Sequence, residues 1–376
     1  MFTVEAGPDV RVVCRQRKVA GAADVYVTVA PATEDADGAE CCAAAWDAVA
    51  SLLDEHDAAI VEERVFVAPA LLSAARAARA RALADRDDGV EPVWLIGPPH
   101  AGGGFAGLII HAVAGGTGPE PLPANGRPRG RRWRHGAYTL VTGANLHGVG
   151  SDPSTQARTM FDAAESLLAG ADAGLADVSR TWLWLRDILA WYDDLNRVRN
   201  ERFRERDLLR ADGAGRLPAS TGIGAAPADG HFCAMDFAAD LGPTRFRPLL
   251  GAGRQNPASR YGSAFSRAAV AETPFGRKVY VSGTAAIDAE GRTLHAGDAR
   301  SQISETVRCV RAVLASADAA DADVVQAIVY CKTPEIARLY RAEVAPAGWP
   351  AIVTVADVCR DDLLFEMECT AMVGAE

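Results

Sequence analysis

One acidic residue lies inside an apolar stretch near the C-terminal end of the sequence. Residues 363–369 read LLFEMEC, and the alternation of side chains along a strand puts Glu366 on one face with Leu364 and Glu368. A carboxylate in such a strand lies either at a solvated edge or in a pocket. In a pocket, desolvation would raise the pKa of Glu366 and make it a usable general acid near neutral pH.

A predicted helix further upstream groups three polar side chains. Tyr192, Asn196 and Arg199 follow one another at four- and three-residue spacing, so a phenol, an amide and a guanidinium share one helix face. This face either turns its polar groups towards water, as in any amphipathic helix, or forms a wall that receives a polar, anionic ligand.

A glycine- and serine-rich segment carries another pair of this kind. In residues 256–267, NPASRYGSAFSR, Tyr261 and Arg267 are six positions apart. Loops hold ligand groups more often than their share of the chain, but an ordinary solvated loop has a similar composition. Both interpretations stay open for this segment.

Cys359 lies seven positions before Glu366, just ahead of a turn with the sequence RDD. From its position alone, Cys359 is a small buried thiol that fills space near this turn. The eight cysteines form no CxxC pair and no regular framework, which indicates reduced, mostly buried thiols.

The usual patterns of cofactor sites are absent or incomplete. The seven histidines show no HxH or HxxxH spacing, so we expect no metal site. Gly102, Gly104 and Gly107 match G-x-G-x-x-G, which binds dinucleotides only between a strand and a helix. Here the glycines lie between two strand-like runs, 93–96 and 108–113, which favours a hairpin or loop. We therefore expect no cofactor.

Composition also argues against several partners. The formal net charge of −10 disfavours nucleic acids and anionic membranes, which attract basic surfaces. The basic run RPRGRRWRH at 127–135 is short and isolated, and we interpret it as solvated linker. No apolar run approaches the roughly 20 residues of a transmembrane helix, and the first twenty residues contain no signal-peptide core. The expected location is the cytoplasm.

The candidate residues belong to a chain with an internal repeat. Residues 166–178 (SLLAGADAGLADV) and 312–324 (AVLASADAADADV) are identical at eight of thirteen positions, at an offset of 146. Each copy has the same order of elements: an apolar strand, a hairpin, a helix, a strand, a second helix, a proline-led strand and a last strand. The first 115 residues show this order without the sequence likeness, which makes them a degenerate third copy.

The predicted fold class is α/β (α+β), with three similar units and helices on one side of each sheet. The expected bounds are a first unit at 1–115, a linker at 116–136, a second unit at 137–241, a connector lining the site at 242–267 and a third unit at 268–376. The linker is rich in glycine, proline and arginine, and the connector carries several prolines.

The third unit resembles the RidA (YjgF) family, whose fold is chorismate-mutase-like, over residues 278–373. The matching residues are VYVSG at 279–283, GD at 297–298, Gln302, ADV at 322–324 and Pro350-Ala351. Such proteins form trimers with ligand sites at subunit clefts, so the resemblance implies a monomeric pseudo-trimer. The deaminases of this family carry an arginine directly after Pro-Ala, where this chain has Ile352 and its second copy has Ser220. This difference disfavours imine deamination.

Taken whole, the chain resembles the chorismatases, a RidA-like family that cleaves chorismate. The likeness covers most of residues 135–373 and is carried by RTWLWLRDILAWYDDLNRVRNERF (180–203), LPASTGIGA (217–225), YGSAFSRA (261–268) and VYVSGTAAID (279–288). It implies that Glu366 protonates the enolpyruvyl group of chorismate and releases pyruvate, without a metal or redox cofactor. Chorismate is a dianion, and our candidates for binding its polar groups are Tyr192, Arg199, Thr221, Tyr261 and Arg267.

The resemblance also bears on the product. The resemblance to the chorismatase family implies that a cysteine at the position of Cys359 is typical of the branch that forms 3-hydroxybenzoate. The expected products are therefore pyruvate and 3-hydroxybenzoate, with or without 4-hydroxybenzoate. One alternative is a chorismate hydrolase that forms 3,4-dihydroxycyclohexa-1,5-diene carboxylate. Another is a RidA-like imine deaminase, or a protein that binds small anions without converting them.

Overall fold

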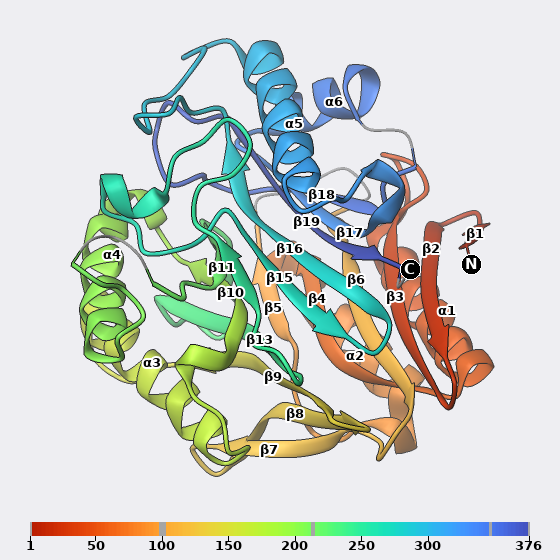
Figure 1. Cartoon of the computed structure of the whole chain (residues 1–376). Helices are drawn as coiled ribbons and strands as arrows, with labels where there is room; N and C mark the ends of the chain where they lie inside the picture. The colour runs from red at the N-terminus through yellow and green to blue at the C-terminus, as the bar shows by residue number, and fades with distance from the viewer. Residues whose placement is uncertain (1, 98–102, 212–214, 346–347, 375–376) are drawn as a thin grey trace.

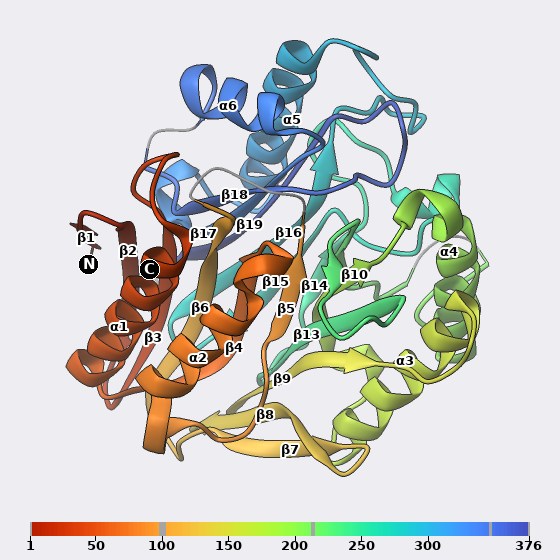
Figure 2. The same cartoon turned by 180° about the vertical axis from the view of Figure 1, so that it is seen from behind.

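Three β-sheets meet at the centre of the protein, and the helices lie around them. The computed structural model describes residues 2–97, 103–211, 215–345 and 348–374. Figures 1 and 2 show that each helix covers the outer side of a sheet, away from the place where the sheets face one another. This arrangement confirms the predicted fold class, with helices on one side of each sheet.

The first unit is formed by β1 (Phe2–Ala6), β2 (Val10–Val19), β3 (Ala22–Pro31), α1 (Gly38–His56), β4 (Ala58–Val67), α2 (Leu72–Leu83), β5 (Val93–Ile96) and β6 (Phe105–Gly115). Its sheet has the order β1-β2-β3-β6-β4-β5, and a short strand of the second unit, β12 (Ala226–Pro227), extends it beyond β5. The strand–helix order expected of the degenerate copy is therefore present.

The second unit repeats this arrangement. It consists of β7 (Glu120–Ala124), β8 (Arg127–His135), β9 (Tyr138–His147), α3 (Pro153–Ala169), β10 (Val178–Leu185), α4 (Ile188–Glu205), β11 (Ala219–Ile223) and β13 (Cys233–Leu241). Its sheet has the order β11-β10-β13-β9-β8-β7. As in the first unit, the last strand is inserted between the two strands that precede and follow the first helix.

The third unit has the same topology. It consists of β14 (Arg247–Leu249), β15 (Ala268–Thr273), β16 (Gly276–Ala285), α5 (Ala299–Ala315), β17 (Val324–Cys331), α6 (Pro334–Glu343), β18 (Ala351–Val355) and β19 (Phe365–Val373), in the sheet order β14-β15-β16-β19-β17-β18. The first helix of every unit begins in the same way, because Asp37, Asp152 and Asp298 each accept hydrogen bonds from backbone N–H groups of the first turn.

The repeat extends to single residues of the sheets. The pairing of the two central strands has an irregularity at Ile60/Glu62 in the first unit, Val178/Arg180 in the second and Val324/Gln326 in the third. The three units have the same strand pairing before and after this irregularity. Their residues can therefore be matched position by position. The second and third irregularities are 146 residues apart, which is the offset of the sequence repeat.

The segment expected to be a linker is instead part of the second sheet. Most of residues 116–136 form β7 and β8, which pair with each other, and β8 pairs with β9. Arg131 and Trp133 alternate inward along β8 and are 2% and 0% exposed. Arg131 binds Asp88 of the first unit, at 2.6 Å from Nε to the carboxylate. The sequence did not predict this half-buried strand because it contains many arginines. The charges of its inward residues are neutralised only by a distant part of the chain.

One hydrophobic core lies between the three sheets, and each unit has a separate outer core under its helices. The central core contains residues from all three units, among them Tyr26, Trp182 and Tyr280. The outer cores pack the apolar faces of the helices against their own sheets. The units are therefore joined through the inner faces of their sheets.

A buried ammonium group links the three units at this centre. Lys278 of β16 lies 3.9 Å from a carboxylate oxygen of Asp24 on β3 and 3.7 Å from one of Asp240 on β13. Burial alone would raise the pKa of Asp24, but Lys278 and His111 outweigh it and lower this pKa to about 2. The three charges come from three different units, so each unit contributes to neutralising the others.

Three other expectations concern the chain as a whole. No helix of the described residues is long and apolar enough to cross a membrane. All eight cysteines are free thiols. Gly102 lies outside the described residues, but β6 follows Gly104 directly, and no helix begins at the described glycines of this motif.

Candidate active site

A small cavity lies between the second and third units, and most of the predicted site residues line it. Its walls come from α4 and β11 of the second unit, and from β16, β19 and two loops of the third. Six of the seven predicted residues are part of its lining: Tyr192, Arg199, Tyr261, Arg267, Cys359 and Glu366. The fold therefore brings together groups that are up to 174 positions apart in the sequence, between 192 and 366.

Glu366 lies on β19 and faces this cavity. The residue is 5% exposed. Burial raises the pKa of Glu366 to about 8, and the neighbouring Glu368 adds to this effect, while Arg180 and Arg267 oppose it. Its carboxyl group lies directly against the backbone of β16, where a methyl group on Gly283 would overlap a carboxyl oxygen. Glu366 is therefore mostly protonated at neutral pH, as a proton donor must be.

Glu368 has the opposite environment, although it lies on the same strand face. Its carboxylate accepts hydrogen bonds from Arg180 Nη2 at 2.6 Å and from Trp182 Nε1 at 2.7 Å, and also contacts the hydroxyl group of Thr221. Thr221 Oγ1 in turn accepts a hydrogen bond from the backbone N–H of Gly283 at 2.9 Å. The Thr221 hydroxyl therefore supports Glu368 and β16, and Thr221 is the one predicted site residue that is not part of the lining.

The polar face of α4 points inward. Tyr192 and Arg199 line the cavity, and Asn196 accepts a hydrogen bond from Arg199 Nη2 at 2.5 Å. Arg199 is 2% exposed, and its Nε has no hydrogen-bond partner among the described residues. This face is therefore not turned towards water, and the buried guanidinium N–H is costly without an acceptor. That the face receives a ligand stays a prediction.

Arg267 approaches the cavity from the opposite side. Its Nε and Nη2 donate to the backbone carbonyl of Asn256 at 3.0 and 2.9 Å, and it also donates to the hydroxyl of Tyr261. The ring of Phe265 lies 5.5 Å from the guanidinium carbon of Arg267 and 5.5 Å from that of Arg199. One aromatic ring thus holds two cations in place on either side of the cavity.

Cys359 lies beside Glu366 at the edge of the cavity. Burial, together with Glu366, raises the pKa of the Cys359 thiol to about 12. The thiol is therefore neutral and is neither a base nor a strong nucleophile at neutral pH. Its side chain packs against both the central core and the outer core of the second unit.

The cavity is closed in this conformation. Its volume is about 50 Å³, whereas small-molecule sites usually measure roughly 300–1,000 Å³. Tyr261 is held inward by Arg267, and the guanidinium of Arg360 lies 5.9 Å from the centre of the Tyr261 ring. A substrate-sized ligand therefore requires these side chains to move outward.

Several lining residues were not predicted from the sequence. They are Ser220, Gly222, Ser263, Phe265, Gly283, Ala285, Ile287, Arg360 and Leu363. Arg180, which binds Glu368, was also missed. It shares a strand face with Trp182 and Trp184, so the argument that singled out Glu366, a charge in an apolar strand, would have found it. The lining glycines carry no such signal, because their role depends on side chains that approach from other elements, Tyr192 in the case of Gly222 and Glu366 in the case of Gly283.

Comparison with known proteins identifies the fold. Residues 257–373 match the family model described as Endoribonuclease L-PSP. The structure is similar to the crystal structure of a chorismatase, with 20% sequence identity and a TM-score of 0.54, over 70% of this chain and 82% of that chain. No curated protein matches the sequence.

Single-unit proteins match only a part of the chain. A member of the YjgF/YER057c/UK114 family from Mycobacterium tuberculosis matches with 25% identity and a TM-score of 0.25, over 31% of this chain and 96% of that chain. Yeast Mmf1 matches with 18% identity and a TM-score of 0.27, over 34% of this chain and 98% of that chain.

The protein is thus built from RidA-type (YjgF) units, three in one chain. Over 70% of the chain its structure is chorismatase-like. At 20% identity this likeness establishes the fold.

Proposed function

We propose that the protein is a chorismatase, an enzyme that releases pyruvate from chorismate, with Glu366 as the general acid. The observation that carries this proposal is the buried Glu366, whose pKa is raised, in a cavity with two buried arginines, Arg199 and Arg267. Chorismate has two carboxylates and an acid-labile enol ether, so its cleavage needs a proton donor between fixed cations. The chorismatase-like fold supports the same assignment.

The first step is proton transfer from Glu366 to the terminal methylene carbon of the enolpyruvyl group. The methylene becomes a methyl group, and the adjacent carbon takes up positive charge that the ether oxygen shares. Glu366 is left as a carboxylate, whose charge Arg180 and Arg267 stabilise. Glu368 keeps its own partners throughout and needs no proton exchange.

Two routes lead from this cation to pyruvate. If water attacks the cationic carbon, the hemiketal that forms breaks its bond to the ring oxygen and releases the dihydroxydiene carboxylate. If the substrate's own ring hydroxyl attacks the ring carbon that carries the ether, the bond from that carbon to the ether oxygen breaks, pyruvate leaves and the hydroxyl proton is lost. The epoxide that forms then opens one C–O bond and loses a ring proton while its oxygen takes up a proton, which gives a hydroxybenzoate. We propose the second route and 3-hydroxybenzoate as the main product, with or without 4-hydroxybenzoate.

The decisive experiment is to incubate the pure protein with chorismate and measure pyruvate with lactate dehydrogenase and NADH. We expect release well above the spontaneous decay seen with Glu366→Gln. Binding of chorismate without pyruvate would leave an anion-binding protein. Ammonia release from an imino acid would instead indicate a deaminase. That second function is disfavoured. Ile352 pairs with Ile328, and by strand register its counterpart in the second unit is Thr221, which pairs with Trp182, and not Ser220 as the sequence indicated. Neither copy therefore has an arginine at this position.

Replacing Cys359 should change the product and not the release of pyruvate. The neutral thiol occupies space beside Glu366 where a water molecule could otherwise approach the cation. We therefore expect Cys359→Ala to shift the product mixture towards the dihydroxydiene carboxylate, as measured by chromatography. The buried Cys309, on α5, is a matched control, and Cys309→Ala should keep the wild-type mixture. A wild-type enzyme that forms only the dihydroxydiene would contradict this role of Cys359.

Replacing either cavity arginine should weaken substrate binding. Hydrogen bonds to charged groups contribute about 1.5–3 kcal/mol, so Arg199→Ala or Arg267→Ala should raise KM roughly 10- to 150-fold. Arg204, which is exposed on the same helix as Arg199, serves as a control, and Arg204→Ala should leave KM unchanged. Unchanged KM values in both cavity variants would show that other cations hold the substrate.

A further inference from the structure

The pseudo-threefold arrangement gives the protein a second cleft that corresponds to the candidate active site. It lies between the first and second units and encloses about 530 Å³, within the roughly 300–1,000 Å³ usual for small-molecule sites. Its walls come from α2, β5, β8 and β9, together with the segment before β13. These are the counterparts of the elements that line the Glu366 cavity, and Figure 2 shows them together in the lower half of the molecule.

The cleft has an arginine at the position of Arg267. In the second unit Gly130 pairs with Gly143, which stands opposite Phe237. In the third unit Ala268 pairs with Val281, which stands opposite Cys369. Gly130 and Ala268 are therefore equivalent, and the residues immediately before them are Arg129 and Arg267.

The cleft has no acid at the position of Glu366. Glu366 pairs with Tyr330 and Ala285 in the third sheet. The matching residue of the second sheet is Ala234, which pairs with Trp184 and His147. The cation is thus kept and the proton donor is missing.

The charges that line this cleft are mainly positive and mainly unpaired. Three arginines, Arg76, Arg127 and Arg129, line it, against two carboxylates, Glu91 and Asp229. Within the described part of the chain, none of the three arginines has a carboxylate oxygen within 4.0 Å, whereas most other arginines of the protein form such ion pairs. Arg129 is half-buried and donates to the backbone carbonyl of Asn145 at 3.1 Å.

Two buried polar atoms of residues that line the cleft also lack a hydrogen-bond partner within the described part of the chain. Trp94 and Asn145 both line the cleft and are 3% and 5% exposed. Among the described residues, neither Trp94 Nε1 nor Asn145 Oδ1 has a hydrogen-bond partner. A buried donor or acceptor without a partner is costly, so a ligand that bonds these atoms would gain free energy on binding.

A metal ion is a less suitable occupant. His147, Asp229 and His231 bring one ligand atom each within 4.8 Å of one another, a grouping that the histidine spacing did not reveal. However, Nη2 of Arg129 lies 3.1 Å from Nε2 of His147, the same nitrogen that faces Asp229 at 4.0 Å. A guanidinium is always charged and can only donate, so a cation at this place would be repelled.

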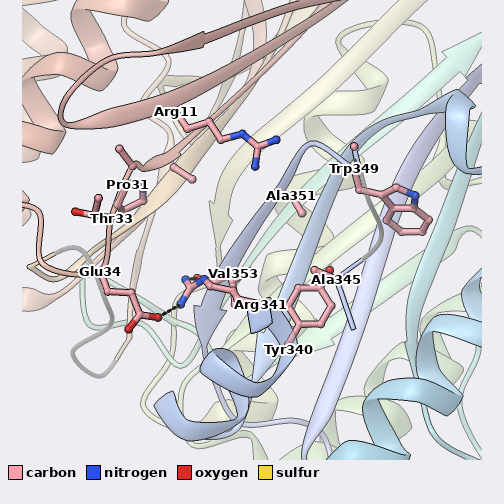
Figure 3. Close-up of a pocket in the computed structure, with 13 residues that line it drawn as sticks. Arg11, Pro31, Thr33, Glu34, Tyr340, Arg341, Ala345, Trp349, Ala351 and Val353 are labelled. Atoms are coloured by element: carbon pink, nitrogen blue, oxygen red, sulfur yellow. Dashed lines mark hydrogen bonds and ion pairs between the residues drawn. The ribbon is translucent and has the colours of Figure 1, made fainter. Parts of the chain in front are cut away.

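The third cleft, between the third and first units, also has a buried donor without a partner among the described residues, Trp349 Nε1. Figure 3 shows its lining, in which Arg341 forms an ion pair with Glu34 at 3.4 Å. By register, the position of Glu366 is occupied by Gly107, which pairs with Phe66. By register, the position of Arg267 is occupied by Val13, because Cys14 pairs with Val27 and Val27 pairs with Ile110. Unpaired buried polar atoms and an arginine equivalent to Arg267 thus occur together only in the other two clefts of the described structure.

We propose that the cleft between the first and second units binds a small organic carboxylate and does not convert it. The carboxylate is held by Arg129 with Arg76 and Arg127, and the remaining polar groups of the ligand meet Trp94 and Asn145. Because Ala234 replaces the acid, the ligand is bound without proton transfer. This binding site does not depend on which reaction takes place at Glu366.

The test is calorimetric titration of the full chain with 3-hydroxybenzoate, which has a ring, a hydroxyl and one carboxylate. We expect two binding events in the wild type, one of which Arg129→Gln weakens roughly 10- to 100-fold, the effect of losing a hydrogen bond to a charged group. Arg267→Gln should weaken the other event. If the Glu366 cavity does not bind the probe, a single event remains that responds to Arg129→Gln alone, and the second site stands while the proposed function loses support.

A second variant guards against misfolding. Arg76 is exposed on α2, so Arg76→Gln should fold normally and still weaken the Arg129-dependent event. Arg81, exposed on the same helix outside the cleft, is the matched control, and Arg81→Gln should change neither event. The proposal is overturned if Arg129→Gln and Arg76→Gln titrate like the wild type. It is equally overturned if inorganic phosphate or Zn²⁺ binds this cleft more tightly than the carboxylate.

Discussion

Glu366→Gln should abolish the release of pyruvate from chorismate while leaving chorismate binding nearly intact. The amide has almost the same shape as the acid but cannot supply a proton, and general acid catalysis contributes roughly 10²- to 10⁴-fold to the rate. The measurement is kcat from the coupled pyruvate assay, with chorismate affinity determined separately by calorimetry. Glu272, exposed on β15, provides the control, since Glu272→Gln should behave like the wild type.

The pH dependence of the same reaction tests the protonation state. Because burial and Glu368 raise the pKa of Glu366 to about 8, the acid form predominates below this pH. The rate should therefore be nearly constant from pH 6 to pH 7 and should fall as the pH rises through about 8. A variant Glu366→Gln that keeps more than a third of the wild-type rate would remove Glu366 from the mechanism.

Lys278→Ala should destabilise the whole protein by about 3–5 kcal/mol, the usual cost of removing one partner from a buried ion pair. The reason is that the carboxylates of Asp24 and Asp240 would then stay buried between the units without the cation that neutralises them. The free energy of unfolding in urea measures this loss. Lys18 is exposed at the end of β2, and Lys18→Ala should change the stability by less than about 0.5 kcal/mol.

Acid unfolding should show the same interaction. The pKa of Asp24 is lowered to about 2 in the folded chain, below its ordinary value of 3.8. The stabilisation from this carboxylate is therefore fully present above pH 3.8 and is lost as the pH falls towards 2. Lys278→Ala should unfold at a higher pH than the wild type, because its Asp24 has lost the cation. Identical acid midpoints would show that Lys278 does not hold the three units together.

The order of secondary structure could be predicted from the sequence because it follows from local periodicity. The predicted helix that carries Tyr192 and Arg199 is present as α4, and Glu366 lies in a strand, β19, as its apolar surroundings indicated. The bounds expected between the units stay predictions, apart from the linker at 116–136. The prediction of a linker was wrong because β8 is stabilised by residues such as Asp88 and Glu63, which a local sequence pattern does not include.

The candidate site was predicted in part for the same reason. Glu366 could be found because a carboxylate in an apolar strand is visible locally, and Tyr192 and Arg199 because they share a helix face. Gly283 could not be assigned a role, since the need for a glycine comes from Glu366 on a neighbouring strand. Likewise, Thr221 is directed to Glu368, a residue 147 positions away.

The sequence by itself determined the three-unit order, the place of Glu366 within an apolar strand and the polar face of α4, because period, spacing and hydrophobicity act over a few residues. Only the tertiary structure decided which groups are paired and which are left free for a ligand. Arg180 is paired with Glu368, whereas the cleft arginine Arg129 has no carboxylate oxygen within 4.0 Å in the described part of the chain. Burial and charge neutralisation depend on the contacts between units, and these are made by residues far apart in the chain.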